Sequence, residues 1–230
     1  MRSSAASDVY KRQILISCCP GGNVSNLLVV LARGNAALSV SLTATSSLAA
    51  AFITPLAILF WSRFYPPTAT LLTEIEFDEV SFLLQTSLML VVPLCAGMLL
   101  AKWAPSIAAR IRAPLIGLAS LGLLTIIVST LVKYSAQFMS IGAPLLGIVL
   151  VHNAAAFSLG FISARLIQAD PPSTRALTYE VGIQNSGLGI VILLTQLGGL
   201  GGAAAVAGLW GVWHIVAGLV LVFLFRWKGD

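Results

Sequence analysis

The sequence predicts an all-α integral membrane protein. Apolar residues make up 58% of its 230 residues, charged residues make up only 9%, and the mean hydropathy is +0.96. Soluble domains carry roughly a quarter charged residues, so this composition excludes an ordinary soluble fold. The apolar residues form runs close to the ~20 residues that a helix needs to cross a bilayer. The net charge of +5 is therefore assigned to loops beside a lipid bilayer rather than to a nucleic-acid-binding surface.

Seven membrane segments account for most of the chain. In order they are 14–31, 37–60, 81–101, 114–132, 141–166, about 178–198 and 201–225. Residues 1–12 are polar and contain no apolar run, so they are not a signal peptide, and we expect them to be a non-native tail. The membrane domain then covers 13–230, and its abrupt start predicts a chain truncated at the N-terminus. The acidic stretch at 74–79 is most simply a solvated connector.

The first segment is interrupted in its middle. Pro20-Gly21-Gly22 breaks a helix, and Asn23 and Asn26 can share one face of the helix that resumes. These residues predict either a kinked helix whose polar groups bond to neighbours or one member of a pair of discontinuous helices. Interrupted segments in two halves of a membrane protein point to a transporter binding site.

The second segment begins with small residues that carry hydroxyl groups. Ser39 and Thr43 are four residues apart, so their hydroxyls lie on one helical face. Close helix packing supported by hydroxyl hydrogen bonds is one interpretation, and oxygen ligands for a cation are the other. Pro55 predicts a kink, and Arg63 marks the exit from this segment.

The third, fourth and fifth segments contain fewer polar residues. Basic residues lie between the third and the fourth, and Lys133 follows the fourth. The fifth contains the pair His152-Asn153. Such a pair is more often bonded within the fold than used as a ligand, and a role in substrate binding is the alternative.

The sixth segment holds the key charged residue. Of eight acidic residues, Glu180 alone stands at the mouth of an apolar span without a neighbouring charge. An ionisable group at that depth is costly and predicts a functional site. Glycines 182, 187 and 189 weaken the helix, and a break is tolerated where the freed backbone groups line a cavity or bind something. An interrupted segment rich in oxygen suits a hard cation such as sodium.

The loop charges predict the orientation in the membrane. The loops that share one side with the C-terminus carry eight basic residues: Arg33, Lys102, Arg110, Arg112, Arg165, Arg175, Arg226 and Lys228. The other side carries Arg63, Lys133, the basic residues of the tail and the acidic stretch. The positive-inside rule then places the C-terminus of a multi-pass cell-membrane protein in the cytoplasm.

Three motifs together resemble the bile acid:sodium symporter family. They are CCPGGNVSN at 18–26, LARGNAALSV at 31–40 and EVGIQNSGL at 180–188, in the family's order, and the match runs from about Ile14 to the end. The resemblance implies an inverted-repeat transporter of ten helices, in which two discontinuous helices cross inside a core domain beside a panel domain. The seven segments resemble helices four to ten. Core-type segments are expected at 13–61 and 140–226, and panel-type segments at 81–133.

The resemblance also implies the site residues. The first sodium site resembles Ser25, Asn26, Ser39, Thr43 and Glu180. The second resembles Glu180 and Gln184 with the backbone of Val181 and Ile183. The substrate cavity is expected beside the crossing, with Asn23, Asn185 and His214. His214, inside the last segment, is otherwise expected to be a packed residue rather than a catalytic one.

The implied function is sodium-coupled symport of a small organic anion such as a bile acid, pantoate or a keto acid. Sodium is the coupling ion, and no cofactor is expected. The exposed N-termini of half-helices favour an anionic substrate. A cation channel or a sodium/proton exchanger using Glu180 is the alternative. An enzyme is not expected, because the sequence shows no nucleophile with a base and no metal cluster near Glu180.

Overall fold

The computed structural model describes residues 17–64, 78–133, 135–196 and 203–228, and within them every regular element is a helix. The helices are α2 (Val24–Leu31), α3 (Ala36–Phe64), α5 (Glu79–Trp103), α6 (Pro105–Lys133), α7 (Ser135–Leu166), α8 (Pro171–Gly182), α9 (Ser186–Gln196) and α10 (Ala203–Lys228). The expected tail at 1–12, the start of the first segment, and Glu74 and Glu76 lie outside the described residues.

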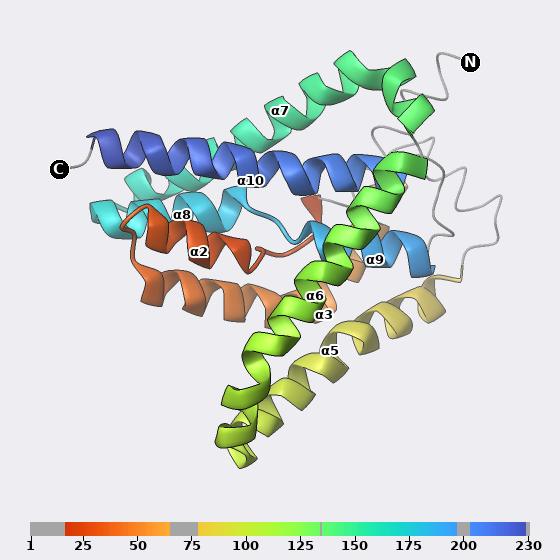
Figure 1. Cartoon of the computed structure of the whole chain (residues 1–230), viewed down its shortest axis with the longest axis horizontal. Coiled ribbons are helices and arrows are strands. Elements are labelled where there is room, and N and C mark those ends of the chain that lie inside the picture. Colours follow the sequence, from red (N-terminus) through yellow and green to blue (C-terminus); the bar gives the residue numbers. More distant parts are fainter. Residues whose placement is uncertain (1–16, 65–77, 134, 197–202, 229–230) are drawn as a thin grey trace.

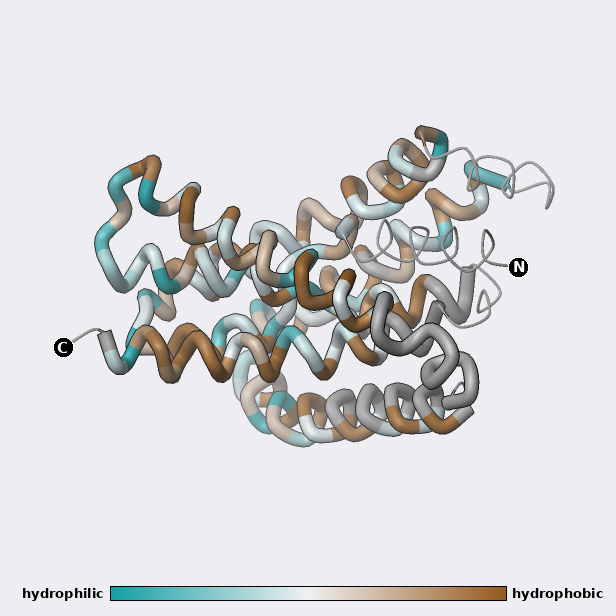
Figure 2. The backbone as a smooth tube through the Cα atoms, turned by 90° about the horizontal axis from the view of Figure 1, so that it is seen from above, coloured by the Kyte–Doolittle hydropathy of each residue, from teal (hydrophilic) through white to brown (hydrophobic). Residues whose placement is uncertain are grey.

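Four of the described stretches are long and apolar enough to cross a membrane: Ala36–Trp61, Glu79–Trp103, Leu146–Leu166 and Gly208–Trp227. On α5, Leu84, Leu88 and Val92 repeat every four residues and are 59%, 57% and 58% exposed. An apolar helix face left open in this way suits contact with lipid. Figure 2 shows hydrophobic stretches along the helices and hydrophilic residues at turns on the side of the C-terminus. The structure agrees with an all-α membrane protein, and the count of seven segments stays a prediction.

Three helices begin earlier than their apolar runs predicted. α6 begins at Pro105, α7 at Ser135 and α8 at Pro171, instead of near 114, 141 and 178. Proline is favoured in the first turn because its missing N–H would have no helical partner there and its φ is already helical. Apolar composition marks only the part of a helix that lipid or the core covers, so polar first turns escape such a prediction.

The two short helices α2 and α8 lie side by side, with α10 on one side and α3 on the other (Figure 1). One buried cluster joins α2, α8, α10 and α7: Leu28, Val29, Ala32, Phe157, Ala176, Tyr179, Ile183 and Val222. The Tyr179 hydroxyl also donates to the Gly218 carbonyl at 3.2 Å, which ties α8 to α10. The interrupted helices therefore form the centre of the fold.

α7 and α8 pack closely through two glycines. A Cβ on Gly160 would lie 2.7 Å from the Leu177 carbonyl oxygen, and a Cβ on Gly182 would lie 2.0 Å from a Phe157 ring carbon. Small residues allow two membrane helices to approach at this distance. The contact holds α8 firmly against a long neighbour.

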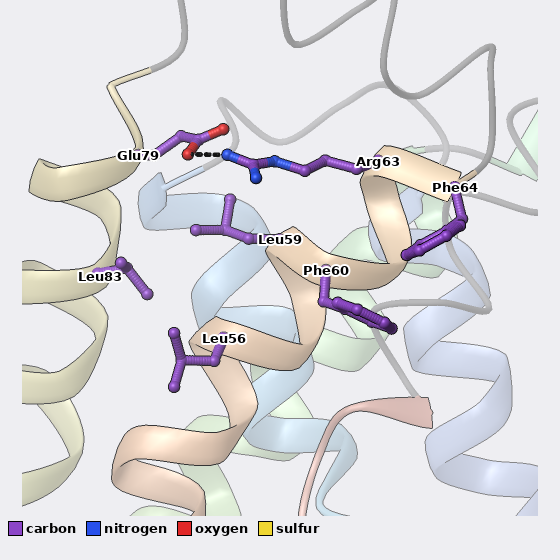
Figure 3. Close-up of a pocket in the computed structure, with 7 residues that line it drawn as sticks. All are labelled: Leu56, Leu59, Phe60, Arg63, Phe64, Glu79 and Leu83. Atoms are coloured by element: carbon purple, nitrogen blue, oxygen red, sulfur yellow. Dashed lines mark hydrogen bonds and ion pairs between the residues drawn. The ribbon is translucent and has the colours of Figure 1, made fainter.

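α5 and α6 form a hairpin outside this centre, and α6 runs diagonally across it in the view of Figure 1. They contact the centre chiefly through α3 and α10. A cavity of about 550 Å³ lies between the ends of α3 and α5, lined by Leu56, Leu59, Phe60, Arg63, Phe64, Glu79 and Leu83. The guanidinium of Arg63 reaches across to Glu79 at 2.5 Å, above the leucine side chains (Figure 3).

Candidate functional site

Two extended segments cross at the centre of the fold and form one antiparallel bridge. The Gly22 N–H donates to the Ile183 carbonyl at 2.9 Å, and the Asn185 N–H donates to the Pro20 carbonyl at 2.8 Å. A break in a membrane helix frees backbone groups that need partners, and here each break supplies them to the other. The two interruptions predicted from the sequence thus meet in the structure.

Local chemistry explains both breaks. Pro20 has no N–H for a helix, and a Cβ on Gly22 would lie 2.9 Å from the Gln184 carbonyl oxygen, so only glycine permits this approach. α8 ends at Gly182, and Ile183 is extended, with φ −107° and ψ 104°. Gly187 and Gly189, which were also expected to weaken the helix, lie inside α9.

Three hydroxyl groups converge on the Glu180 carboxylate. Ser25 Oγ and Ser39 Oγ donate to Oε1 at 2.5 and 2.6 Å, and Thr43 Oγ1 donates to Oε2 at 2.8 Å. The three donors are at most 5% exposed. α2 supplies Ser25, α3 supplies Ser39 and Thr43 from one face, and α8 supplies Glu180. The structure therefore unites residues that are up to 155 positions apart in the sequence.

Asn26 completes this group, which we call the Glu180 cluster: Ser25, Asn26, Ser39, Thr43 and Glu180. Asn26 Oδ1 lies 2.9 Å from Ser39 Oγ and 3.4 Å from Thr43 Oγ1. A hydroxyl has one proton, so neither can donate to Asn26 and to Glu180 at once. With Oδ1 facing inward the cluster has more acceptors than protons, which a cation would satisfy. If the Asn26 amide turns by half a turn, its Nδ2 replaces Oδ1 beside Ser39 and Thr43. Its N–H groups then donate to the cluster, which suits the state without a cation.

Gln184 lies in the crossing itself. Its Oε1 is buried and has no hydrogen-bond partner among the described residues. A buried acceptor without a partner costs about 1–3 kcal/mol, so this atom is suited to a ligand. Of the two expected backbone contributors nearby, Ile183 gives its carbonyl to the Gly22 N–H, and Val181 is 40% exposed in the last turn of α8.

Of the three expected substrate residues, two lie at the crossing. Asn23 is exposed just before α2, and Asn185 precedes α9. Asn185 Oδ1 accepts from the Leu188 N–H at 3.0 Å and so caps α9. His214 is 2% exposed on α10, and its Nδ1 lies 2.6 Å from the Trp210 carbonyl one turn earlier.

The pair His152-Asn153 is bonded within the fold, as the packing interpretation expects. Asn153 Nδ2 donates to the Gly182 carbonyl at 2.9 Å and so binds the end of α8. His152 Nε2 lies 3.2 Å from Ser17 Oγ, and its ring centroid lies 4.7 Å from that of Trp210. Asn153 thus supports the crossing from α7, and His152 ties α7 to Ser17 and α10.

The chemistry of the cluster is that of a hard-cation site. It offers one carboxylate and several neutral oxygens, the donors that such cations prefer in proteins. In the part of the chain that the structure describes, no group of three or more His, Cys, Asp or Glu side chains could hold a metal ion.

Interrupted helices that meet near the middle of the fold, as they do here beside the half-buried Glu180, are typical of secondary membrane transporters. Residues 12–141 match the Sodium Bile acid symporter family. The chain belongs to this family, as the resemblance of its motifs implied, and it is a multi-pass membrane protein.

Three relatives illustrate the similarity. "Uncharacterized sodium-dependent transporter YocS" of Bacillus subtilis (strain 168) is 31% identical over 189 residues, which cover 81% of this chain and 56% of that protein. "Probable sodium/metabolite cotransporter BASS1, chloroplastic" of Oryza sativa subsp. japonica is 33% identical, with 80% and 43% covered. The "Ileal sodium/bile acid cotransporter" of Homo sapiens is 32% identical, with 80% and 53% covered. The chain spans about half the length of these relatives.

Residues that the sequence did not single out also hold the site together. Arg175 on α8 bonds to the end of α2, and Asn35 before α3 bonds to the start of α8. Asn35 lies inside the second motif, and Arg175 is the single charged residue of α8 besides Glu180. The position of Asn35 in a motif and the charge of Arg175 are the features of the sequence that could have identified them.

Proposed function

We propose that the protein couples the movement of a small organic anion across the cell membrane to the movement of sodium. The Glu180 cluster carries this proposal. Its five residues come from three helices. Its hydroxyls lie 2.5–2.8 Å from one half-buried carboxylate, and the cluster has more hydrogen-bond acceptors than protons. Sodium needs about six oxygens to replace its water shell, a number of the order found for other hard cations.

Two sodium sites share Glu180 in this proposal. The first uses Ser25, Asn26, Ser39 and Thr43 with the carboxylate. The second uses the carboxylate, the unpartnered Oε1 of Gln184 and the backbone of Val181 and Ile183. No cofactor beyond the coupling ion takes part.

Substrate binding follows from the position of the crossing. α2 begins at Val24 and α9 begins at Ser186, so the positive ends of two helix dipoles lie beside Asn23 and Asn185. That environment favours an anion, of which a bile acid, pantoate or a keto acid are the classes to test. A sodium ion bound to the Glu180 cluster holds α2, α3 and α8 together. It thereby fixes the crossing at which the anion binds, so the binding of the cation favours the binding of the anion.

Transport requires that one part of the fold moves against another. We assign α5 and α6 to the panel and the other helices to the core, namely α2, α3, α7, α8, α9 and α10. The core then rocks against the panel. Seven segments in an inverted-repeat arrangement and a cytoplasmic C-terminus belong to the same proposal. Protease access to a C-terminal tag in oriented vesicles tests the orientation.

Uptake into proteoliposomes tests the function. A labelled bile acid, pantoate and a keto acid are each supplied with an inward gradient of sodium or of potassium. We expect uptake of at least one anion to require sodium and to be abolished by Glu180→Gln, with the variant still folded. Ser41→Ala is the control, because Ser41 is exposed on α3 and bonds only to its own helix at Ala37. Sodium flux that no organic anion influences would instead identify a channel or an exchanger.

A further inference from the structure

Arg175 joins the first half of α8 to the end of α2. Its Nη1 donates to the Ala32 carbonyl at 2.9 Å and to the Arg33 carbonyl at 3.3 Å. The last carbonyls of a helix have no partner inside it, so Arg175 supplies one. The guanidinium carbon also lies 5.9 Å from the centroid of the Phe225 ring on α10, within the range of a cation–π contact. One side chain thus connects three helices.

Asn35 joins the start of α3 to the first turn of α8. Its N–H donates to the Pro172 carbonyl at 2.9 Å, and its Nδ2 donates to Ser173 Oγ at 3.2 Å. Its Oδ1 accepts from the Leu38 N–H at 3.0 Å, which caps α3. We refer to Asn35, Ser173 and Arg175 as the clasp.

The turn between α2 and α3 is shaped for the clasp. Arg33 has φ 55°, a left-handed conformation that closes α2, and the Gly34 N–H donates to the Val29 carbonyl at 2.8 Å. A Cβ on Gly34 would lie 2.8 Å from Val29 Cγ1 and 3.2 Å from Arg175 Cβ. Glycine at this position lets the turn lie directly on α8. The Arg-Gly-Asn part of the second motif therefore has a structural role distinct from cation ligation.

The clasp and the Glu180 cluster join the same three helices at two levels. Along α8, Arg175 and Glu180 are five residues apart, which corresponds to about 7.5 Å at the rise of an α-helix. On α3, Ser39 lies one turn beyond Asn35, and its N–H donates to the Asn35 carbonyl at 3.0 Å. On α2, Ser25 lies at the end opposite to the turn. α2 has only eight residues and moves as one rigid unit. A shift of α2 at the clasp therefore displaces the oxygens of the Glu180 cluster.

We infer that the clasp positions the cation ligands by fixing α2 and α3 against α8, an inference that rests on the proposed sodium coupling. The clasp residues do not bind the cation, and they act through Ser25, Ser39 and Glu180. Cation ligands must lie within about 0.2 Å of their ideal distances. Loss of the groups that orient ligands typically costs about 10–100-fold in affinity.

The central variant is Arg175→Met, which keeps a long side chain and removes both hydrogen bonds. It is expected to raise the sodium concentration for half-maximal uptake by about tenfold or more. Arg175→Lys is expected to fall between this variant and the wild type, because an ammonium keeps the charge without the planar fork. Ser173→Ala removes one hydrogen bond and is expected to raise that concentration about two- to tenfold.

Sodium titrations of uptake in proteoliposomes, at a saturating anion concentration, provide the first measurement. Sodium-dependent thermal shift of the purified protein provides the second. Arg165→Met is the matched control: Arg165 is exposed in the last turn of α7, so its loss removes the same charge near the same end of the fold without touching the clasp.

A positioning role predicts that high sodium restores the maximal rate, with the anion half-saturation unchanged at saturating sodium. A reduced yield or maximal rate with unchanged sodium half-saturation would show that the clasp only supports the fold, and would overturn the inference. If Arg175→Met does not fold, unchanged sodium half-saturation in both Arg175→Lys and Ser173→Ala overturns it equally. A wild-type protein with neither sodium-dependent uptake nor a sodium-dependent thermal shift would refute the proposed function instead.

Discussion

The Glu180 carboxylate receives its hydrogen bonds from neutral hydroxyls. Ser25, Ser39 and Thr43 donate to it and leave its negative charge in place. A lysine or arginine partner would neutralise that charge and compete with a cation for the same oxygens. Neutral donors can rotate their protons away when a cation arrives, so the same atoms serve both states.

Thr43→Val tests one ligand of the cluster. Valine keeps the shape of the side chain but removes Oγ1, which lies 2.8 Å from Glu180 Oε2. Loss of one neutral oxygen is expected to raise the sodium half-saturation about two- to tenfold, with anion selectivity unchanged. Thr45→Val is the control, since Thr45 is exposed and bonds to the Ser41 carbonyl of its own helix. A change in selectivity without a change in sodium dependence would place Thr43 in the substrate cavity.

Gln184→Leu tests the second proposed site. Removing an unpartnered buried acceptor is expected to leave stability without sodium unchanged or slightly higher. If Gln184 Oε1 binds a second sodium ion, the Hill coefficient of the sodium titration falls toward 1. Thermal unfolding with and without sodium and the uptake titration measure the two effects. A stability loss in sodium-free buffer with unchanged cooperativity would contradict this role.

At the scale of elements, the contact between α7 and α8 fixes the helix that carries Glu180. Gly182 faces the Phe157 ring so closely that a methyl group would overlap it, at 2.0 Å from Cδ1. Asn153 binds the Gly182 carbonyl from the same helix α7. α7 therefore fixes the position of the end of α8, where the crossing begins.

Gly182→Ala is expected to destabilise the protein by about 1–3 kcal/mol, the usual cost of overpacking a well-packed site. The clash is with a side chain, so adding Phe157→Leu to Gly182→Ala should restore part of the loss. Gly117→Ala is the control, because nothing lies within 4 Å of its Cβ position on α6. Thermal unfolding in detergent provides the measurement. Equal melting temperatures for Gly182→Ala and the wild type would show that the approach is looser than the structure has it.

Features encoded by neighbouring residues could be predicted from the sequence. Pro20 and Gly182 break helices by their own chemistry, and the spacing of Ser39 and Thr43 places two hydroxyls on one face. The bonds of Arg175 could not be predicted, because its partners are backbone carbonyls, which every residue has. The start of α8 at Pro171 was predicted wrongly, since polar first turns carry no apolar signal. The sodium and substrate roles, including that of His214, stay predictions.

For the molecule as a whole, the joint between the centre and the α5–α6 hairpin is the place where transport requires motion. Arg63 at the end of α3 pairs with Glu79 at the start of α5 at 2.5 Å, beside the cavity of Figure 3. The hydrogen bond that Arg63 donates to Glu79 raises the pKa of the guanidinium and lowers the pKa of the carboxyl group, so the pair stays charged at any assay pH near neutrality. The side chains of Arg63 and Glu79 are 64% and 40% exposed, and an ion pair open to solvent forms and breaks readily.

A reversible cross-link across this joint tests whether the hairpin moves. Arg63→Cys and Glu79→Cys are combined in a protein whose Cys18, Cys19 and Cys95 are replaced by alanine, and a cleavable bifunctional maleimide joins the two new thiols. Uptake is expected to stop on cross-linking and to return on cleavage. The sodium-dependent thermal shift is expected to persist, because the Glu180 cluster lies on α2, α3 and α8 and not on the hairpin.

The control joins Glu79→Cys to Leu83→Cys within α5, where residues four apart are already neighbours and a link restrains nothing. If the protein with the link between positions 63 and 79 transports as fast as the same protein without the link, α3 and α5 keep their separation through the cycle. The core and the panel then do not rock at this end.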